Sequence, residues 1–329
     1  MAWEKAFIMH IKCLSIGHCL GAAALSLLAA CGGSDDAAPG AANGNQAVAL
    51  SAQNEPTLSA AAVREFASAL GVTGLAAVIS PNQAAIASLP ARRAFAAARQ
   101  PGRVTVQGDA FERECSGGGT VVLETVDVPP SLKSTFKACV EGDASVNGAI
   151  NVALVSISDD KKLQTFDATL TALSVALENT FAAKLDGGLR LALDTSTAGQ
   201  TKTRTTSNTI SFELSTAGKV QVSSTLSDAQ FTNVSSDAGQ STDTFSYSSS
   251  GTLEPLGAVA YKAQTVTALV TPAGAADPTS GQVKLIVNGK GIILLTVEAT
   301  RVHVQADVEG DGVFEVDRFD TWSNLSGGL

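Results

Sequence analysis

The residues best suited to chemistry lie near the end of the chain, in the run Asp307-Val308-Glu309-Gly310-Asp311-Gly312-Val313-Phe314-Glu315. Carboxylates at alternate positions followed by glycine can arrange oxygen ligands around a hard cation, as in an EF-hand loop. Calcium is therefore the one cofactor that the sequence suggests. Its ligands would be the side chains of Asp307, Glu309, Asp311 and Glu315 and the carbonyl of Val313.

Two departures weaken the calcium hypothesis. The third position of the loop is the longer Glu309, and the twelfth is Arg318, where an EF-hand has a bidentate glutamate. The pattern around the loop also indicates no flanking helices. The alternative is a polar hairpin turn in which Gly310 and Gly312 supply positive φ angles. Both interpretations stay open at this point.

Catalytic patterns are weaker still. Beyond the first thirty residues the chain has one histidine, His303, which alternates with Val302 and Val304 as in a strand. A Ser-His-Asp triad also needs an activated serine, and the chain has no Gly-x-Ser-x-Gly elbow. We therefore expect no enzymatic activity, and a hydrolase is the least favoured function.

An apolar run from about Ile16 ends in Leu28-Ala29-Ala30-Cys31 and follows Lys12. A basic start, an apolar stretch of roughly 7–15 residues and small residues before the cut define a secretory signal. The run is shorter than the about 20 residues of a membrane-spanning helix. Residues 1–30 therefore resemble a bacterial lipoprotein signal peptide, with translation starting at Met1 or at Met9.

The motif Leu28-Ala29-Ala30-Cys31 resembles a lipobox. A lipobox implies cleavage before Cys31 and attachment of acyl chains such as palmitate to that cysteine. Gly32 follows the cysteine where an inner-membrane retention signal usually has Asp. The resemblance therefore implies a lipid anchor in the outer membrane, with the protein on the periplasmic face or on the cell surface. Several acyl chains make such anchoring stable.

The cysteines are consistent with an oxidising compartment. Cys13 and Cys19 would leave with the signal peptide and Cys31 would carry lipid, so Cys115 and Cys139 remain as a pair. Without a Cys-x-x-Cys motif or a nearby histidine, we favour a structural disulfide over a redox or metal pair. It would close a loop of about 25 residues, which stabilises a fold by about 3 kcal/mol in the loop-entropy model.

Charge and composition restrict the partners. The net charge of -9 repels phosphate backbones, so nucleic acid is not an expected partner. Aromatic residues make up only 5% of the chain, and Ser, Thr, Ala, Val and Gly dominate its second half. This composition is typical of exposed β-sheet with a thin core.

The residue types and their periodicity divide the chain into four parts. After the signal peptide, residues 31–58 have the polar, aperiodic composition of a flexible tether. Residues 59–102 are Ala-rich and predict short helices, with a narrow apolar stripe that includes Ala61, Val63 and Phe66. Residues 103–325 alternate polar and apolar side chains, as in Ile210-Ser211-Phe212-Glu213-Leu214, which predicts half-buried strands.

Turn residues separate these strands and predict an antiparallel meander of about 12 to 14 strands. Asp186-Gly187-Gly188 is one of these turn signals, and tight turns are expected at Asn147-Gly148 and Asn288-Gly289. A curved open sheet, a half-barrel, a sandwich and a closed barrel all fit this pattern. A membrane-spanning barrel is disfavoured, because the outward faces carry Thr, Ser, Asn and Lys in place of a lipid-facing apolar band.

Four features together resemble a broad set of uncharacterised outer-membrane and periplasmic β-meander lipoproteins. They are Cys115-Ser116-Gly117-Gly118-Gly119-Thr120, Phe136-x-x-Cys139, Asn147-Gly148 and an Asp-rich turn that runs into Trp322. The resemblance covers residues 110–325 and implies a cysteine-clamped hairpin that opens a long meander. It implies no activity.

Two main functions follow. The first is a lipid-anchored, non-catalytic envelope protein whose β domain is a scaffold or binds an envelope protein. The second is a carrier or chaperone for a lipid or another apolar ligand, held in the groove of a curved sheet. The low aromatic content argues mildly against the carrier. Such a groove would be lined by Phe212, Phe231, Phe245, Phe314 and Phe319.

Overall fold

The computed structural model describes eight stretches of the chain. The predicted signal peptide, Cys31 and the segment from residue 67 to residue 103 lie outside them. The described residues are 47–66, 104–107, 110–127, 130–141, 144–177, 181–216, 218–275 and 277–326.

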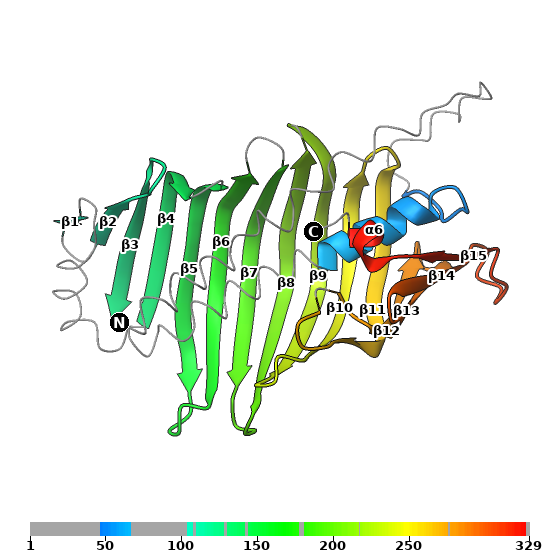
Figure 1. Ribbon diagram of the computed structural model, residues 1–329. Helices are drawn as coiled ribbons and strands as arrows, with labels where there is room; N and C mark the ends of the chain where they lie inside the picture. Colours follow the sequence, from blue (N-terminus) through cyan, green and yellow to red (C-terminus); the bar gives the residue numbers. More distant parts are fainter. Residues whose placement is uncertain are drawn as a thin grey trace.

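Within the described stretches, fifteen strands form one antiparallel sheet, and each strand pairs with the next along the chain (Figure 1). The mainly β, antiparallel meander is thereby confirmed, with one strand more than the pattern predicted. The strands are β1 (Val104–Gln107), β2 (Ala110–Glu114), β3 (Thr120–Asp127), β4 (Pro130–Glu141), β5 (Ala144–Ile157), β6 (Leu163–Leu177), β7 (Phe181–Asp194), β8 (Gln200–Thr216), β9 (Lys219–Ser236), β10 (Ser241–Leu253), β11 (Gly257–Thr271), β12 (Ser280–Val287), β13 (Gly291–Glu298), β14 (Arg301–Asp307) and β15 (Val316–Asp320).

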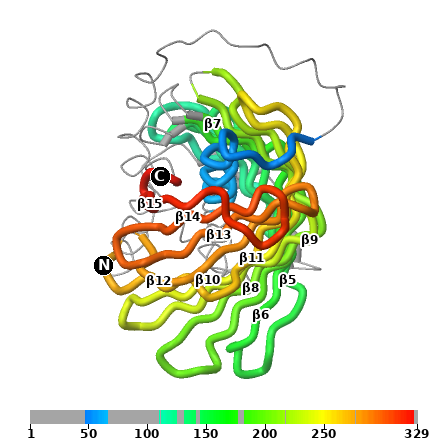
Figure 2. Tube along the Cα trace, turned by 90° about the vertical axis from the view of Figure 1, so that its right-hand side faces the viewer, coloured from blue at the N-terminus to red at the C-terminus, as the bar shows by residue number. Residues whose placement is uncertain are grey.

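The sheet does not close, because β1 and β15 are its two edges and do not pair with each other. It is broad through β3–β9 and curls from β10 onward, so that its last strands turn back over one face (Figures 1 and 2). We call this inner face the concave face. A half-barrel is therefore the closest of the shapes that the sequence allowed.

Period-two alternation produces the strands as predicted. In β8, Ile210, Phe212 and Leu214 are buried, whereas Ser211 between them is exposed. Successive side chains of a strand point to opposite faces, so one face of the sheet becomes apolar. The buried residues of β5–β14 form one continuous core on that face.

One of the two predicted tight turns, and one of the turn signals expected to separate strands, are β-bulges. Asn147-Gly148 lies within β5 and Asp186-Gly187-Gly188 within β7, each at a shift of strand register. Gly148 has φ 97°, and a Cβ there would lie 2.3 Å from the carbonyl oxygen of Ala172. Positive-φ glycine serves bulges as well as turns, which local sequence does not distinguish. Asn288-Gly289 is the expected turn, with φ 51° and 71°.

A helix over residues 55–66 lies on the concave face against β10–β14 (blue in Figures 1 and 2). It begins four residues before the Ala-rich part predicted to be helical. The side chains of Ser51 and Asn54 hydrogen-bond each other's backbone N–H at 3.3 and 2.9 Å, which closes the turn that opens the helix.

The tether predicted over residues 31–58 does not extend to its expected end. Val48 N donates to the carbonyl of Ala258 at 2.7 Å, and Leu50 and Leu58 are buried. Burial of these apolar side chains orders residues 47–58 although their composition is polar. The chain ends in α6 (Trp322–Ser326) over the same face. No described helix is long and apolar enough to cross a membrane.

Candidate functional site

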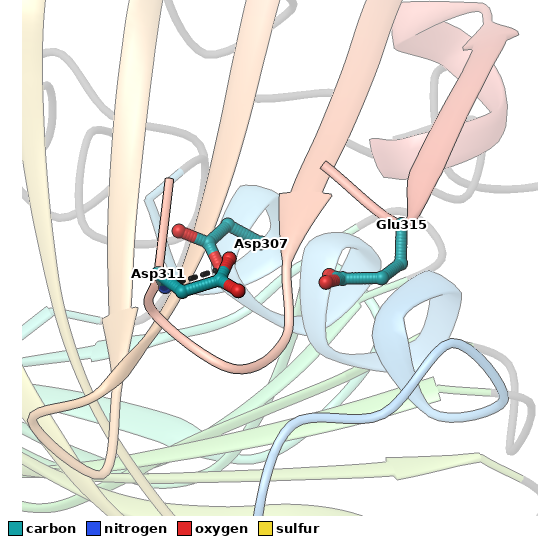
Figure 3. A group of neighbouring side chains, drawn as sticks. All are labelled: Asp307, Asp311 and Glu315. Carbon is teal, nitrogen blue, oxygen red and sulfur yellow. Dashed lines mark hydrogen bonds between the residues drawn. The ribbon is translucent and has the colours of Figure 1, made fainter. Parts of the chain in front are cut away.

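The acidic loop joins the end of β14 to β15. Carboxylate oxygens of Asp307, Asp311 and Glu315 all lie within 4.8 Å of one another, and the side chains turn toward a common point (Figure 3). The structure thus brings together three of the four carboxylates proposed as calcium ligands. Glu309 turns away and pairs with Lys290 at 3.0 Å. Val313 N donates to Asp311 Oδ1 at 2.9 Å.

Hydrogen bonds within the loop also make it a well-formed turn. Asp307 is 2% exposed; its Oδ1 accepts from Gly310 N at 2.6 Å and Asp311 N at 3.1 Å, and its Oδ2 from Gly312 N at 2.8 Å. Glu315 Oε2 accepts from Val308 N at 2.7 Å. Each carboxylate keeps lone pairs that could coordinate a hard cation. The geometry is therefore compatible with both alternatives, a polar turn organised by Asp307 and a carboxylate cluster for a cation.

His303 lies in a contact that offers no nucleophile. Its Nε2 lies 2.8 Å from Asp317 Oδ1, and its ring stacks on that of Phe319 with centroids 4.6 Å apart. The hydrogen bond with His303 lowers the pKa of Asp317. The residues around His303 thus stabilise the pairing of β14 and β15.

Cys115 and Cys139 form a disulfide, with their Cα atoms 5.4 Å apart. This is consistent with the pairing that the sequence favours. Both residues are buried with Val121 in a small cluster apart from the main core. The bond therefore ties β4 to the end of β2 near one edge of the sheet.

An apolar band crosses β5–β10 on the concave face. One cross-strand row is nearly all apolar: Leu154, Phe166, Leu191, Thr205, Phe231 and Phe245 are direct neighbours across six strands. A second row runs Ile150, Leu170, Gly187, Ile210 and Leu226. Phe66 of the helix stacks on Phe245 with ring centroids 4.1 Å apart, so the band and the helix share one face.

Only part of the expected phenylalanine set lines this face. Phe212, Phe231 and Phe245 are buried on it, as expected. Phe314 and Phe319 are 38% and 52% exposed and belong to the acidic loop and to the edge strand β15. The expectation for those two residues is wrong, because neither side chain is buried on the concave face.

Two buried carboxylates hold the helix over residues 55–66. Glu55 is paired with Arg318 of β15, and Glu65 accepts hydrogen bonds from the hydroxyls of Tyr261 at 2.6 Å and Ser249 at 3.1 Å. Burial raises the pKa of Glu65, and the two hydroxyls oppose that rise. Sequence reasoning missed both carboxylates; an acidic residue within the Ala-rich segment was a signal for Glu65, whereas Glu55 lies in the stretch predicted to be a tether.

The helix fills the curled end of the sheet. The space left between Val63, Phe66, Phe245 and Trp322 has a volume of about 10 Å³, which is room for about one water molecule. Over β5–β9 the inward side chains are buried as well, since Phe166, Leu191 and Ile210 are at most 6% exposed.

Comparisons with protein-family models, with curated proteins and with solved structures find no match for this chain. Its chemistry is therefore argued from its own residues.

Proposed function

We propose that the protein is a lipid-anchored, non-catalytic binding protein of the cell envelope that holds an apolar ligand on its concave face. The apolar band across β5–β9 carries the proposal. Its two rows carry Leu, Ile and Phe side chains from five neighbouring strands, and all of them except Leu154 are at most 6% exposed, so the ligand would be enclosed among them.

Binding is tested with the purified mature protein. Extraction of the protein into organic solvent, followed by mass spectrometry, should release a co-purified apolar molecule. The delipidated protein should then bind the environment-sensitive dye Nile red. Replacement of Leu191 by Asn should weaken dye binding at least about ten-fold, since a polar amide interrupts the band.

A matched control replaces Ala192, the neighbour of Leu191 on the opposite face of β7, by Asn. This variant should retain dye binding. If the unmodified protein releases no ligand and binds no dye, the binding function is wrong.

A scaffold without a ligand is the second candidate. The helix fills the curled end of the sheet almost completely, so that part of the concave face has no room for a ligand. This favours a scaffold. In that case residues of the outward face, and not Leu191, would decide which envelope protein binds. Pull-down from cell-envelope extract with the Leu191→Asn variant would then recover the same partner as the native protein.

The anchor rests on the lipobox alone. Cys31→Ser should release the protein from the outer-membrane fraction into the soluble periplasm, or leave its signal peptide attached. Recovery of Cys31→Ser in the outer-membrane fraction would contradict lipid anchoring.

A further inference from the structure

The helix over residues 55–66 is held to the sheet by two contacts of different chemistry. At its start, the fully buried side chain of Glu55 forms an ion pair with Arg318 of β15 at 3.0 Å. Ten residues later, Glu65 is 2% exposed and accepts hydrogen bonds from the hydroxyls of Tyr261 at 2.6 Å and Ser249 at 3.1 Å. The first contact therefore pairs two charges, whereas the second joins a carboxyl group to neutral donors.

The groups that face Glu65 come from three strands and include no cation. They are Ser224 of β9, Tyr247 and Ser249 of β10, and Tyr261 of β11. Burial and the charge of Glu65 both raise the pKa of the two tyrosines, so they remain neutral donors at neutral pH. On the helix itself, the neighbouring Arg64 is half-buried and does not pair with Glu65. An ionised Glu65 is therefore a buried charge without a counterion, which low-dielectric surroundings disfavour.

The half of the helix that carries Glu65 also covers apolar side chains of the curled end. Phe66 stacks on Phe245 with ring centroids 4.1 Å apart. Val63 and Phe66 line the small remaining space together with Trp322, which is 9% exposed. Detachment of this half would uncover Phe245 and Trp322, whereas the ion pair of Glu55 would keep the start of the helix in place.

We propose that this helix is a pH-sensitive clasp, whose second half is held to β9–β11 while Glu65 is protonated and detaches more readily once Glu65 is ionised. The Glu55–Arg318 pair holds the start of the helix in both states. This device is independent of the proposed binding function. Only one consequence rests on that function, namely that an apolar ligand would enter the concave face at the opened end.

The direction of the pH response follows from the two states of Glu65. In the detached state Glu65 is in water and has its ordinary pKa of 4.5, whereas burial raises the pKa in the docked state. The docked state therefore binds more protons. Docking is strongest below pH 4.5 and weakens as the pH rises through the docked pKa.

Hydrogen exchange of the mature protein at pH 4.5 and 7.5 tests the clasp. Protection factors, which correct for the effect of pH on chemical exchange, report local opening even when the open state is rare. Protection of the amides of residues 62–66 should fall about five-fold or more between the two pH values, because ionisation favours the detached state. The amides of Glu55 and Leu58, which donate to the carbonyls of Ser51 and Asn54, should change less than about two-fold.

Two nearly isosteric variants assign the response to Glu65. Glu65→Gln keeps a hydrogen-bond acceptor but cannot ionise, so protection of residues 62–66 should differ less than about two-fold between the two pH values. Asp243→Asn is the matched control and should keep the native response. Asp243 is a buried carboxyl of β10 whose pKa is also raised by burial, but it bonds to Asn233 at 2.7 Å and to Ser241, and not to the helix. Circular dichroism shows whether each variant is folded.

The outcomes decide the proposal without reference to a ligand. The clasp is wrong if protection of residues 62–66 does not fall with pH in the native protein, or falls equally in Glu65→Gln. An equal fall at Leu58 would show that the whole helix opens and would contradict the pinned start. The binding function stands or falls separately, by the release of a co-purified ligand and the binding of Nile red.

Discussion

Glu55 and Arg318, 263 residues apart in the chain, form a two-point ion pair across the concave face. Arg318 Nε lies 3.0 Å from Glu55 Oε2, and Arg318 Nη2 lies 3.2 Å from Glu55 Oε1. The Glu55 side chain is fully buried, whereas that of Arg318 is 28% exposed. The pair therefore joins the start of the helix over residues 55–66 to β15, the last strand of the sheet. This contact adds to the pairing of β15 with β14.

Arg318→Met should destabilise the protein by about 3 kcal/mol, because it leaves the buried carboxylate of Glu55 without its cation. The loss is measured as the change in free energy of unfolding in urea. The double variant Glu55→Gln, Arg318→Met should recover part of it, since no charge is then buried unpaired. Equal losses in the single and the double variant would contradict this account.

Glu65 should make the stability of the fold depend on pH. Its pKa is higher in the folded chain than the ordinary value of 4.5 because the side chain is buried, so the folded state binds more protons than the unfolded state above that pH. The free energy of unfolding contributed by Glu65 is therefore highest below pH 4.5 and falls as the pH rises through the folded pKa.

Glu65→Gln should remove this loss of stability at higher pH, because glutamine does not ionise. Relative to the native protein, the variant should become more stable as the pH rises from 4 to 8, by on the order of 1 kcal/mol. Urea unfolding at pH 4, 6 and 8 measures the difference, and Glu254→Gln, in an exposed turn, is the control. A difference that does not vary with pH would show that Glu65 titrates as an exposed carboxyl does.

Removal of the disulfide should weaken the edge of the sheet that begins with β1. Replacement of Cys115 and Cys139 by Ala should lower the free energy of unfolding by about 3 kcal/mol. Limited proteolysis should then cut first in β2–β4, since the two cysteines pack in a cluster separate from the main core. Intact-mass measurement with alkylation should find no free thiol at either position before reduction; two alkylated cysteines in the native protein would contradict the bond.

The loop from Asp307 to Glu315 should fold without a cation. Asp307→Ala removes the acceptor of three backbone N–H groups and should cost about 2–3 kcal/mol, whereas Asp311→Ala should cost less than about 1 kcal/mol. We expect the melting temperatures in EDTA and in millimolar Ca²⁺ to differ by less than about 1 °C. A larger rise with Ca²⁺ that Asp311→Ala abolishes would assign the loop to calcium binding.

Local sequence was enough for the repeating parts of this protein. Alternation as in Ile210-Ser211-Phe212 predicted strands, and short polar connections between them predicted an antiparallel meander. Both follow from interactions between neighbours in the chain, which a pattern of residue types records. The same holds for Asn288-Gly289, where both residues have the positive φ angles of a hairpin turn.

Local sequence failed where the same residue types serve two geometries. Asn147-Gly148 has the composition of a turn but is a bulge, because the neighbouring strands β4 and β6 extend past it on both sides. Only the pairing of those strands decides between the two. The number of strands and the open edges were likewise decided by pairing.

Tertiary structure alone decided which carboxylates are buried on the concave face. Glu55 and Glu65 occur in segments whose composition predicts a tether and short Ala-rich helices, and both are buried because the helix packs against the curled end of the sheet. Burial changes the energy of a carboxylate or a hydroxyl by removing water, and the path of the whole chain determines which residues lose their water.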